Sequence, residues 1–149
     1  MNINIKGLTL SQIEYLRVQL TEYKKSLPIQ KRIKTFDDVL SYLGIEVNEF
    51  NDSAYNLTKD EIAYKKLKFI VQALNEGWQP DWNSNECKYY PWFKMVGSGA
   101  GFSFIGCVYD YSSQSVGSRL VFKSRELAEY AGQQFIDLYR DMMLFHHNN

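Results

Sequence analysis

Histidine and cysteine carry out much of nucleophilic and metal chemistry, and this chain has few of either. Its two histidines, His146 and His147, are adjacent near the C-terminal end. A serine or cysteine nucleophile is usually activated by a histidine base, and a structural metal needs several converging ligands. The cysteines, Cys87 and Cys107, are far apart and match no CxxC spacing. We therefore predict a chain without catalytic residues, metal site or cofactor.

The run Gly97-Ser-Gly-Ala-Gly101 invites comparison with phosphate-binding loops. Such loops lead into a helix whose N-terminal amides meet the phosphate, and the P-loop ends in Gly-Lys-Ser or Gly-Lys-Thr. Here we expect a strand to follow, and that ending is missing, so a glycine hairpin loop is the preferred interpretation. The pair Asp37-Asp38 is explained by favourable negative charge in the first turn of a helix.

Basic residues gather in two places, and each has two interpretations. Most such clusters are solvated turns or helix ends, whereas a minority contact nucleic-acid phosphates. The seventeen basic and seventeen acidic residues balance, which argues against duplex binding through phosphates alone. The clusters are Lys24, Lys25, Lys31, Arg32 and Lys34 around a linker, and Lys65, Lys66 and Lys68 on a helix.

Aromatic residues are the main compositional deviation, at 15% of the chain, and all three tryptophans fall within residues 78–92. Small α+β domains use such residues to fix a loop against a sheet, which is the preferred interpretation. The functional alternative is stacking on the bases of single-stranded nucleic acid beside basic residues. A sugar or a protein hot spot would use the same side chains. The candidate binding residues are Trp78, Trp82, Tyr89, Tyr90, Trp92, Lys88, Lys94, Arg119 and Lys123.

Three helices are expected in the first half of the chain. Ser11 to Glu14 fits a capping box, and Pro28 ends the helix that follows. Its apolar stripe spans only two heptads, which favours a docked helix over a coiled coil. Thr35 caps a short helix closed by Gly44, a loop covers 45–57, and Thr58 to Glu61 caps a third helix stopped by Gly77. The stripes are Ile13, Leu16, Leu20, Tyr23 and Leu27 in the first helix, and Ala63, Leu67, Ile70, Val71 and Leu74 in the third.

After a loop at 78–86, the second half predicts strands at 88–96, 102–111 and 118–123 and one helix capped by Ser124. Both sides of the second strand are largely apolar, with Phe102, Phe104 and Val108 opposite Ile105, Cys107 and Tyr109, so we expect it to be central. Gly132, inside the helix, suggests close approach by another backbone. The buried helical stripe is expected at Leu127, Ala131, Gln134, Phe135, Leu138 and Met142.

These elements predict an α+β fold with three N-terminal helices, a three-stranded antiparallel meander and a C-terminal helix. The 149 residues fit one domain, with 58–145 as the main core and 1–30 either in it or docked on a partner. We find no secretory signal and no apolar run long enough for a bilayer, so we expect a cytoplasmic protein. The sequons at Asn51 and Asn56 are then accidental, and the zero net charge favours a homo-oligomer.

From the third helix onward the chain resembles a group of small uncharacterised proteins from phages, prophages and mobile elements of gut Bacteroidetes. The resemblance rests on Ala73-Leu-Asn-Glu-Gly-Trp78, Pro80-Asp-Trp82, Tyr89-Tyr-Pro-Trp-Phe93, Val116-Gly-Ser-Arg-Leu120, Phe122-Lys-Ser124, Glu126-Leu-Ala-Glu-Tyr-Ala-Gly132 and Gln134-Phe135. It covers roughly residues 60–145, with looser likeness at Lys34-Thr-Phe-Asp-Asp38 and Leu43-Gly-Ile45. It implies a role in nucleic-acid metabolism, host takeover or defence, and no particular activity.

We therefore expect a non-enzymatic binding protein of phage or mobile-element origin that binds single-stranded nucleic acid through aromatic stacking. The alternative is a protein–protein interaction module, an inhibitor or adaptor of a host protein that presents an exposed aromatic patch.

Overall fold

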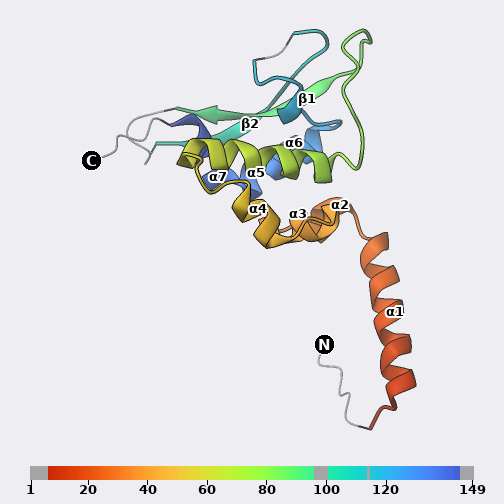
Figure 1. Cartoon of the computed structure of the whole chain (residues 1–149). Helices are drawn as coiled ribbons and strands as arrows, with labels where there is room; N and C mark the ends of the chain where they lie inside the picture. Colours follow the sequence, from red (N-terminus) through yellow and green to blue (C-terminus); the bar gives the residue numbers. More distant parts are fainter. Residues whose placement is uncertain (1–6, 96–100, 114, 145–149) are drawn as a thin grey trace. The chain divides into compact units, whose positions relative to one another are not determined.

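The computed structural model describes residues 7–95, 101–113 and 115–144. The chain divides into two compact units, Met1–Arg32 and Ile33–Asn149. The smaller unit contains α1 (Leu10–Ser26) and α2 (Ile29–Arg32), drawn in red and orange in Figure 1. No helix in the described part of the chain is long and apolar enough to cross a bilayer.

The N-cap of α1 lies two residues earlier than predicted. Thr9 is the N-cap and forms a reciprocal capping box with Gln12, in place of Ser11 and Glu14. Both pairs fit the same Ser/Thr-x-x-Glu/Gln pattern, and the earlier one starts the helix. No residue of α1 is buried.

The larger unit opens with α3 (Phe36–Leu43), and both of its predicted ends are confirmed. Thr35 caps its start, and Gly44 closes it in the left-handed conformation with φ of 69°. The predicted loop at 45–57 is wrong, because it contains α4 (Val47–Asp52). Its N-cap residue, Glu46, makes no side-chain capping bond, so a local signal was missing. Packing supports α4 instead, since the buried Phe50 ring contacts Phe36 at 4.8 Å and Phe69 at 6.0 Å between centroids.

Helix α5 (Lys59–Leu74) is confirmed with its capping box between Thr58 and Glu61 and all five predicted core residues buried. Its C-cap is Asn75, and Gly77 follows in the turn with φ of 85°. As predicted, no helix or strand covers residues 78–86.

The sheet has two strands, β1 (Lys88–Lys94) and β2 (Ser103–Asp110), paired antiparallel from Lys88 opposite Asp110 to Lys94 opposite Ser103. The predicted meander is therefore wrong. Residues 118–120 form the short 3₁₀ helix η1 (Ser118–Leu120) after Gly117, which has φ of 74°. Because η1 occupies the start of the predicted third strand, the pairing with the sheet is reduced to an isolated bridge between Phe122 and Tyr89. The predicted hairpin loop 97–101 lies outside the described residues except for Gly101.

The strand β2 is an edge of this sheet, and not the covered central strand predicted from its composition. The register shifts between Trp92 and Phe93, which pair with Gly106 and Phe104, so Ile105 is an extra residue in β2. A bulge of this kind changes the alternation of faces. Cys107, opposite Pro91, therefore joins the side of Phe104, while Ile105 is left 56% exposed.

The predicted C-terminal helix is two helices, α6 (Arg125–Gln134) and α7 (Ile136–Met143). The break is at Phe135, whose φ of −114° and ψ of 29° are not helical. Ser124 caps α6 as predicted, and Leu127, Ala131 and Phe135 are buried. Beyond the break Tyr139 takes the buried position, whereas the predicted residues Gln134, Leu138 and Met142 are exposed or half-buried.

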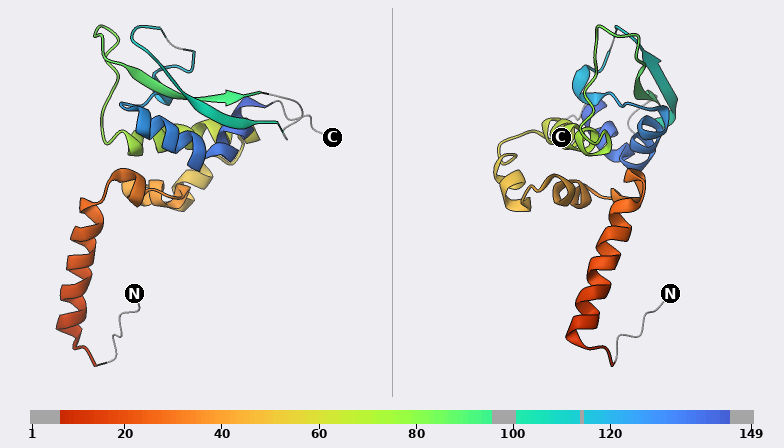
Figure 2. Two further views of the ribbon diagram at one scale, coloured as in Figure 1. Left: turned by 180° about the vertical axis from the view of Figure 1, so that it is seen from behind. Right: turned by 90° about the vertical axis from the view of Figure 1, so that its right-hand side faces the viewer.

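Helix α6 packs on both strands, and α5 packs against α7 and α3. Figure 2 shows these helices of the larger unit on one side of the sheet. Gly132 lies where α6 meets the strands, and a Cβ there would be 2.7 Å from Pro91 and from the Phe104 ring. The close approach predicted at Gly132 is thus made by side chains of the sheet. The α+β class is confirmed, with the strand count and the helix count corrected.

Candidate binding site

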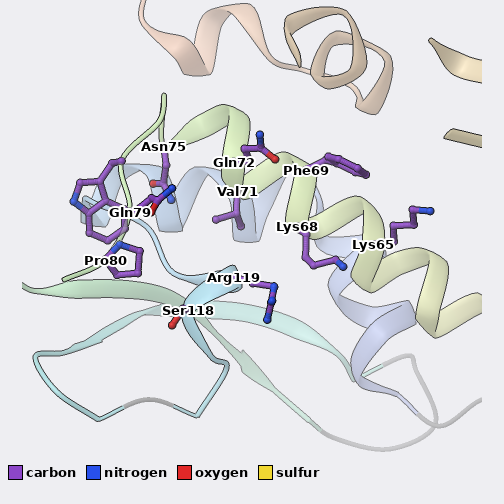
Figure 3. A pocket seen from close by; sticks show the side chains of 11 residues that line it. Lys65, Lys68, Phe69, Val71, Gln72, Asn75, Gln79, Pro80, Ser118 and Arg119 are labelled. Carbon is purple, nitrogen blue, oxygen red and sulfur yellow. The ribbon is translucent and has the colours of Figure 1, made fainter. Parts of the chain in front are cut away.

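A pocket of about 390 Å³ lies between α5, the turn that follows it and η1 (Figure 3). Lys65 and Lys68 from α5 and Arg119 from η1 contribute its positive charge. The pocket also has a carbon-rich wall and several amides. The wall is formed by Phe69, Val71, Trp78 and Pro80, and the amides belong to Gln72, Asn75 and Gln79.

The helical period of α5 explains why its polar residues meet in this pocket. Lys65, Lys68 and Gln72 are spaced by three and four residues, which places them on one side of the helix. The capping box fixes where α5 starts, and the core residues fix its rotation about its own axis. These side chains are therefore held in place by the same pattern that buries Leu67 and Ile70.

The opposite wall is held by Asn75, which is 4% exposed. Its Nδ2 donates to the carbonyl oxygen of Val121 at 2.8 Å, and its Oδ1 accepts from the backbone N–H of Lys123 at 3.1 Å. One buried amide thus satisfies a donor and an acceptor of the segment that follows η1. It fixes this segment, which begins two residues after Arg119, to the end of α5.

Two indoles anchor the loop that leaves α5. Trp78 donates through Nε1 to Glu86 Oε1 at 2.7 Å, and Trp82 donates through Nε1 to Ser118 Oγ at 2.8 Å. Both tryptophans are half-buried. Ser118 also lines the pocket, so it connects the pocket to the region around Trp82. The preferred prediction, that these aromatics fix a loop against the fold, describes Trp82 well, whereas Trp78 is also part of the pocket wall.

The three basic side chains of the pocket differ in their own contacts. Lys65 Nζ donates to the carbonyl oxygen of Ser53 at 2.7 Å and to its Oγ at 2.6 Å. Lys68 Nζ lies 5.1 Å from the centre of the Tyr64 ring. Arg119 is exposed and makes no ion pair with any described residue. Because no described carboxylate lines the pocket, its charge favours an anion.

Two predicted binding lysines are used within the fold. Lys88 is completely buried, with Nζ 5.3 Å from the Trp82 ring centre and 3.4 Å from the carbonyl oxygen of Ser84. Lys123 pairs with Glu76 at 3.2 Å. Trp82, Lys88 and Lys123 therefore support the loop and the sheet end.

Tyr90, Trp92 and Lys94 lie on the side of β1 turned away from α6. Tyr90 and Trp92 have ring centroids 6.4 Å apart, and Trp92 is 49% exposed. Trp92 pairs with Gly106 and has the bulged Ile105 beside it, which makes an exposed apolar surface. Lys94 is exposed at the end of the strand.

Tyr89 belongs to a different cluster on the helix-facing side of the sheet. Its ring lies 5.7 Å from that of Tyr109, and the Arg125 guanidinium lies 5.8 Å from its centre. The pKa of Tyr89 is raised mainly by a hydrogen bond with the Cys87 thiol and, to a smaller extent, by partial burial. A hydrogen bond with the same thiol raises the pKa of Tyr111.

The predicted binding residues therefore do not form one surface. Only Trp78 and Arg119 line the pocket, with Lys65 and Lys68, which the sequence marked only as an ambiguous basic cluster. Phe69, Gln72, Gln79 and Ser118 were not predicted. The three-and-four spacing on α5 was a usable signal for Gln72, while the position of η1 against α5 had no signal in the sequence.

The described residues contain no cluster of three or more His, Cys, Asp or Glu that would hold a metal ion. The tail from residue 145, which includes both histidines, lies outside them. No protein-family model, curated protein or solved structure matches the chain.

Proposed function

We propose that this chain is a non-enzymatic binding protein, of phage or mobile-element origin, whose ligand is single-stranded nucleic acid. The observation that supports this most is the pocket, in which Lys68 and Arg119 accompany the Trp78 indole and no described carboxylate is present. Single-strand binders combine backbone-tracking cations with aromatic rings on which bases stack. We assign the phosphate to Lys68 and Arg119 and one base to the wall formed by Trp78 and Pro80.

This assignment predicts both the affinity and its dependence on salt. Each neutralised phosphate of a single strand contributes a slope of about −0.7 to the logarithmic salt dependence of binding. Removing the charge of Arg119 should therefore make the salt slope shallower by about 0.7, the contribution of one phosphate. Stacking on Trp78 should contribute about 1–3 kcal/mol per base, independently of salt.

The test is a fluorescence-anisotropy titration with labelled oligothymidine over a series of salt concentrations. Arg119→Gln should weaken binding and reduce the salt slope, whereas Lys94→Gln, at an exposed cation outside the pocket, should leave the slope unchanged. Trp78→Ala should weaken binding at every salt concentration, whereas Trp92→Ala should not. Trp78 lines the pocket, so quenching of its intrinsic fluorescence gives a second measure of binding.

Binding that is absent at micromolar protein, or that does not respond to salt, would contradict the proposal. Equal losses for Lys94→Gln and Arg119→Gln would show that the effect is one of general charge. Circular dichroism of each variant separates a lost contact from a lost fold.

A protein ligand is the second candidate, and the exposed apolar surface around Trp92 favours it. Trp92 and Ile105 lie side by side at the bulge, and both are about half exposed. Contiguous exposed apolar residues are typical of protein interaction sites. If Trp92→Ala abolishes capture of a specific host protein while the Trp78 and Arg119 variants do not, this candidate replaces the first.

A further inference from the structure

Helix α1 carries large apolar side chains that no other described element of its own unit covers. Leu16, Leu20 and Tyr23 are 42%, 52% and 62% exposed, and no residue of the helix is buried. Most helical stability in proteins comes from packing of an apolar side, not from intrinsic propensity. We therefore expect a binding partner to cover the apolar side of α1.

The apolar residues of α1 follow the spacing of a coiled coil. Ile13, Leu16, Leu20, Tyr23 and Leu27 alternate steps of three and four, which are positions a and d of a heptad. An open hollow of about 610 Å³ lies along this side. Apart from Leu8, the residues that line this hollow occupy heptad positions a, d, e and g. In a coiled coil, residues at these positions form the holes that receive side chains from the second helix.

We propose that α1 pairs with α1 of a second copy of this chain, in parallel and in register. The residues flanking the seam favour this orientation. The g positions hold Gln12, Gln19 and Ser26, and the e positions after the first turn hold Arg17 and Lys24. In a parallel pair, g of one helix faces e of the other, so Gln12 meets Arg17 and Gln19 meets Lys24.

An antiparallel pair would bring e positions opposite e positions. Arg17 and Lys24 would then face the same basic residues of the second copy, and like charges at these positions oppose pairing. The seam is only two heptads long, so the parallel dimer should depend on concentration. This proposed dimer involves none of the residues that line the nucleic-acid pocket, so each proposal can be tested without the other.

The first test is sedimentation equilibrium of the full chain over a range of concentrations. The mass should rise from 17.5 kDa toward twice that value. Leu16→Glu combined with Leu20→Glu should hold it at the monomer value. Tyr15→Glu combined with Val18→Glu changes exposed residues of the same helix away from the seam, and this matched variant should still dimerise.

The second test fixes orientation by oxidative cross-linking of Ile13→Cys, at one end of the seam, with peptide mapping to exclude bonds made by Cys87 or Cys107. A parallel, in-register pair should link the two introduced thiols rapidly, and Tyr15→Cys should link slowly. A chain that stays monomeric overturns the proposal, and so does a dimer that survives the Leu16/Leu20 change. A dimer in which Ile13→Cys fails to cross-link is antiparallel or out of register, and it also overturns the proposal.

Discussion

Tyr139 is enclosed by apolar neighbours, with its ring 4.8 Å from that of Phe93. Its hydroxyl oxygen is buried and has no hydrogen-bond partner among the described residues. Burial accordingly raises the pKa of Tyr139 far above its usual value. A buried hydroxyl without a partner keeps its desolvation cost, about 1–3 kcal/mol, while the ring contributes all of the packing.

Replacing Tyr139 by phenylalanine should therefore stabilise the protein, by about 1 kcal/mol. Tyr130→Phe is the matched control, because the Tyr130 hydroxyl donates to the backbone oxygen of Ile33. That change should lower the free energy of unfolding. Urea denaturation of both variants measures the two effects, and a destabilised Tyr139→Phe would show that its hydroxyl makes a favourable contact.

At the scale of elements, local signals decided which predictions were confirmed. The helices α3 and α5 each carry a capping box and an apolar stripe, and both were found where predicted. Helix α4 has no capping bond from a side chain, and its stability depends on Phe50 reaching Phe36 and Phe69 in other helices. Likewise, the bulge at Ile105 and the break at Phe135 arise from pairing and packing, which sequence periodicity does not encode.

The capping boxes of α3 and α5 each contain a carboxylate, so they also predict how stability responds to acid. Slight burial opposes ionisation of Asp38, but bonds from the N–H groups of Lys34 and Thr35 and from the Thr35 hydroxyl outweigh it and lower its pKa. Hydrogen bonds to the Glu61 carboxylate, mainly from the N–H of Thr58 and also from the Thr58 hydroxyl, lower the pKa of Glu61. A carboxyl with a lowered folded-state pKa contributes stability above its unfolded pKa, about 4, and this is lost as pH falls through the folded value.

The free energy of unfolding should therefore fall as pH decreases from about 5 toward 3. Asp38→Asn combined with Glu61→Gln should be less stable at neutral pH and should lose less stability over this range. Asp37→Asn is a suitable control, because its carboxyl lies in the same turn and makes no described capping bond. Urea denaturation over a pH series measures the slopes, and equal slopes in all variants would contradict the assignment.

At the scale of the whole molecule, the sequence predicted the ingredients of the site better than their arrangement. Trp78 and Arg119 were candidates because aromatic and basic residues together suit nucleic acid, and both line the pocket. Lys88 was a candidate for the same reason, yet it is buried under Trp82. The difference depends on Asn75 and Trp82, which bind residues more than thirty positions away, and such long-range bonds have no periodic signal.

The division into two units leads to a final prediction about the whole chain. Among the residues that the structure describes, every buried apolar one except Ile29 belongs to Ile33–Asn149, and so do the residues that line the pocket. A fragment of residues 33–149 should therefore fold with a cooperative urea transition. It should bind oligothymidine with the salt slope of the full chain, because Lys68, Trp78 and Arg119 are retained.

The same fragment should be monomeric at concentrations where the full chain dimerises, because it lacks α1. Sedimentation equilibrium and anisotropy on one preparation test both statements together. If the fragment dimerises, self-association does not depend on α1. If it folds and loses only oligonucleotide binding, then residues of the first unit, such as Lys24 and Lys31, contact the nucleic acid, and the pocket alone does not account for binding.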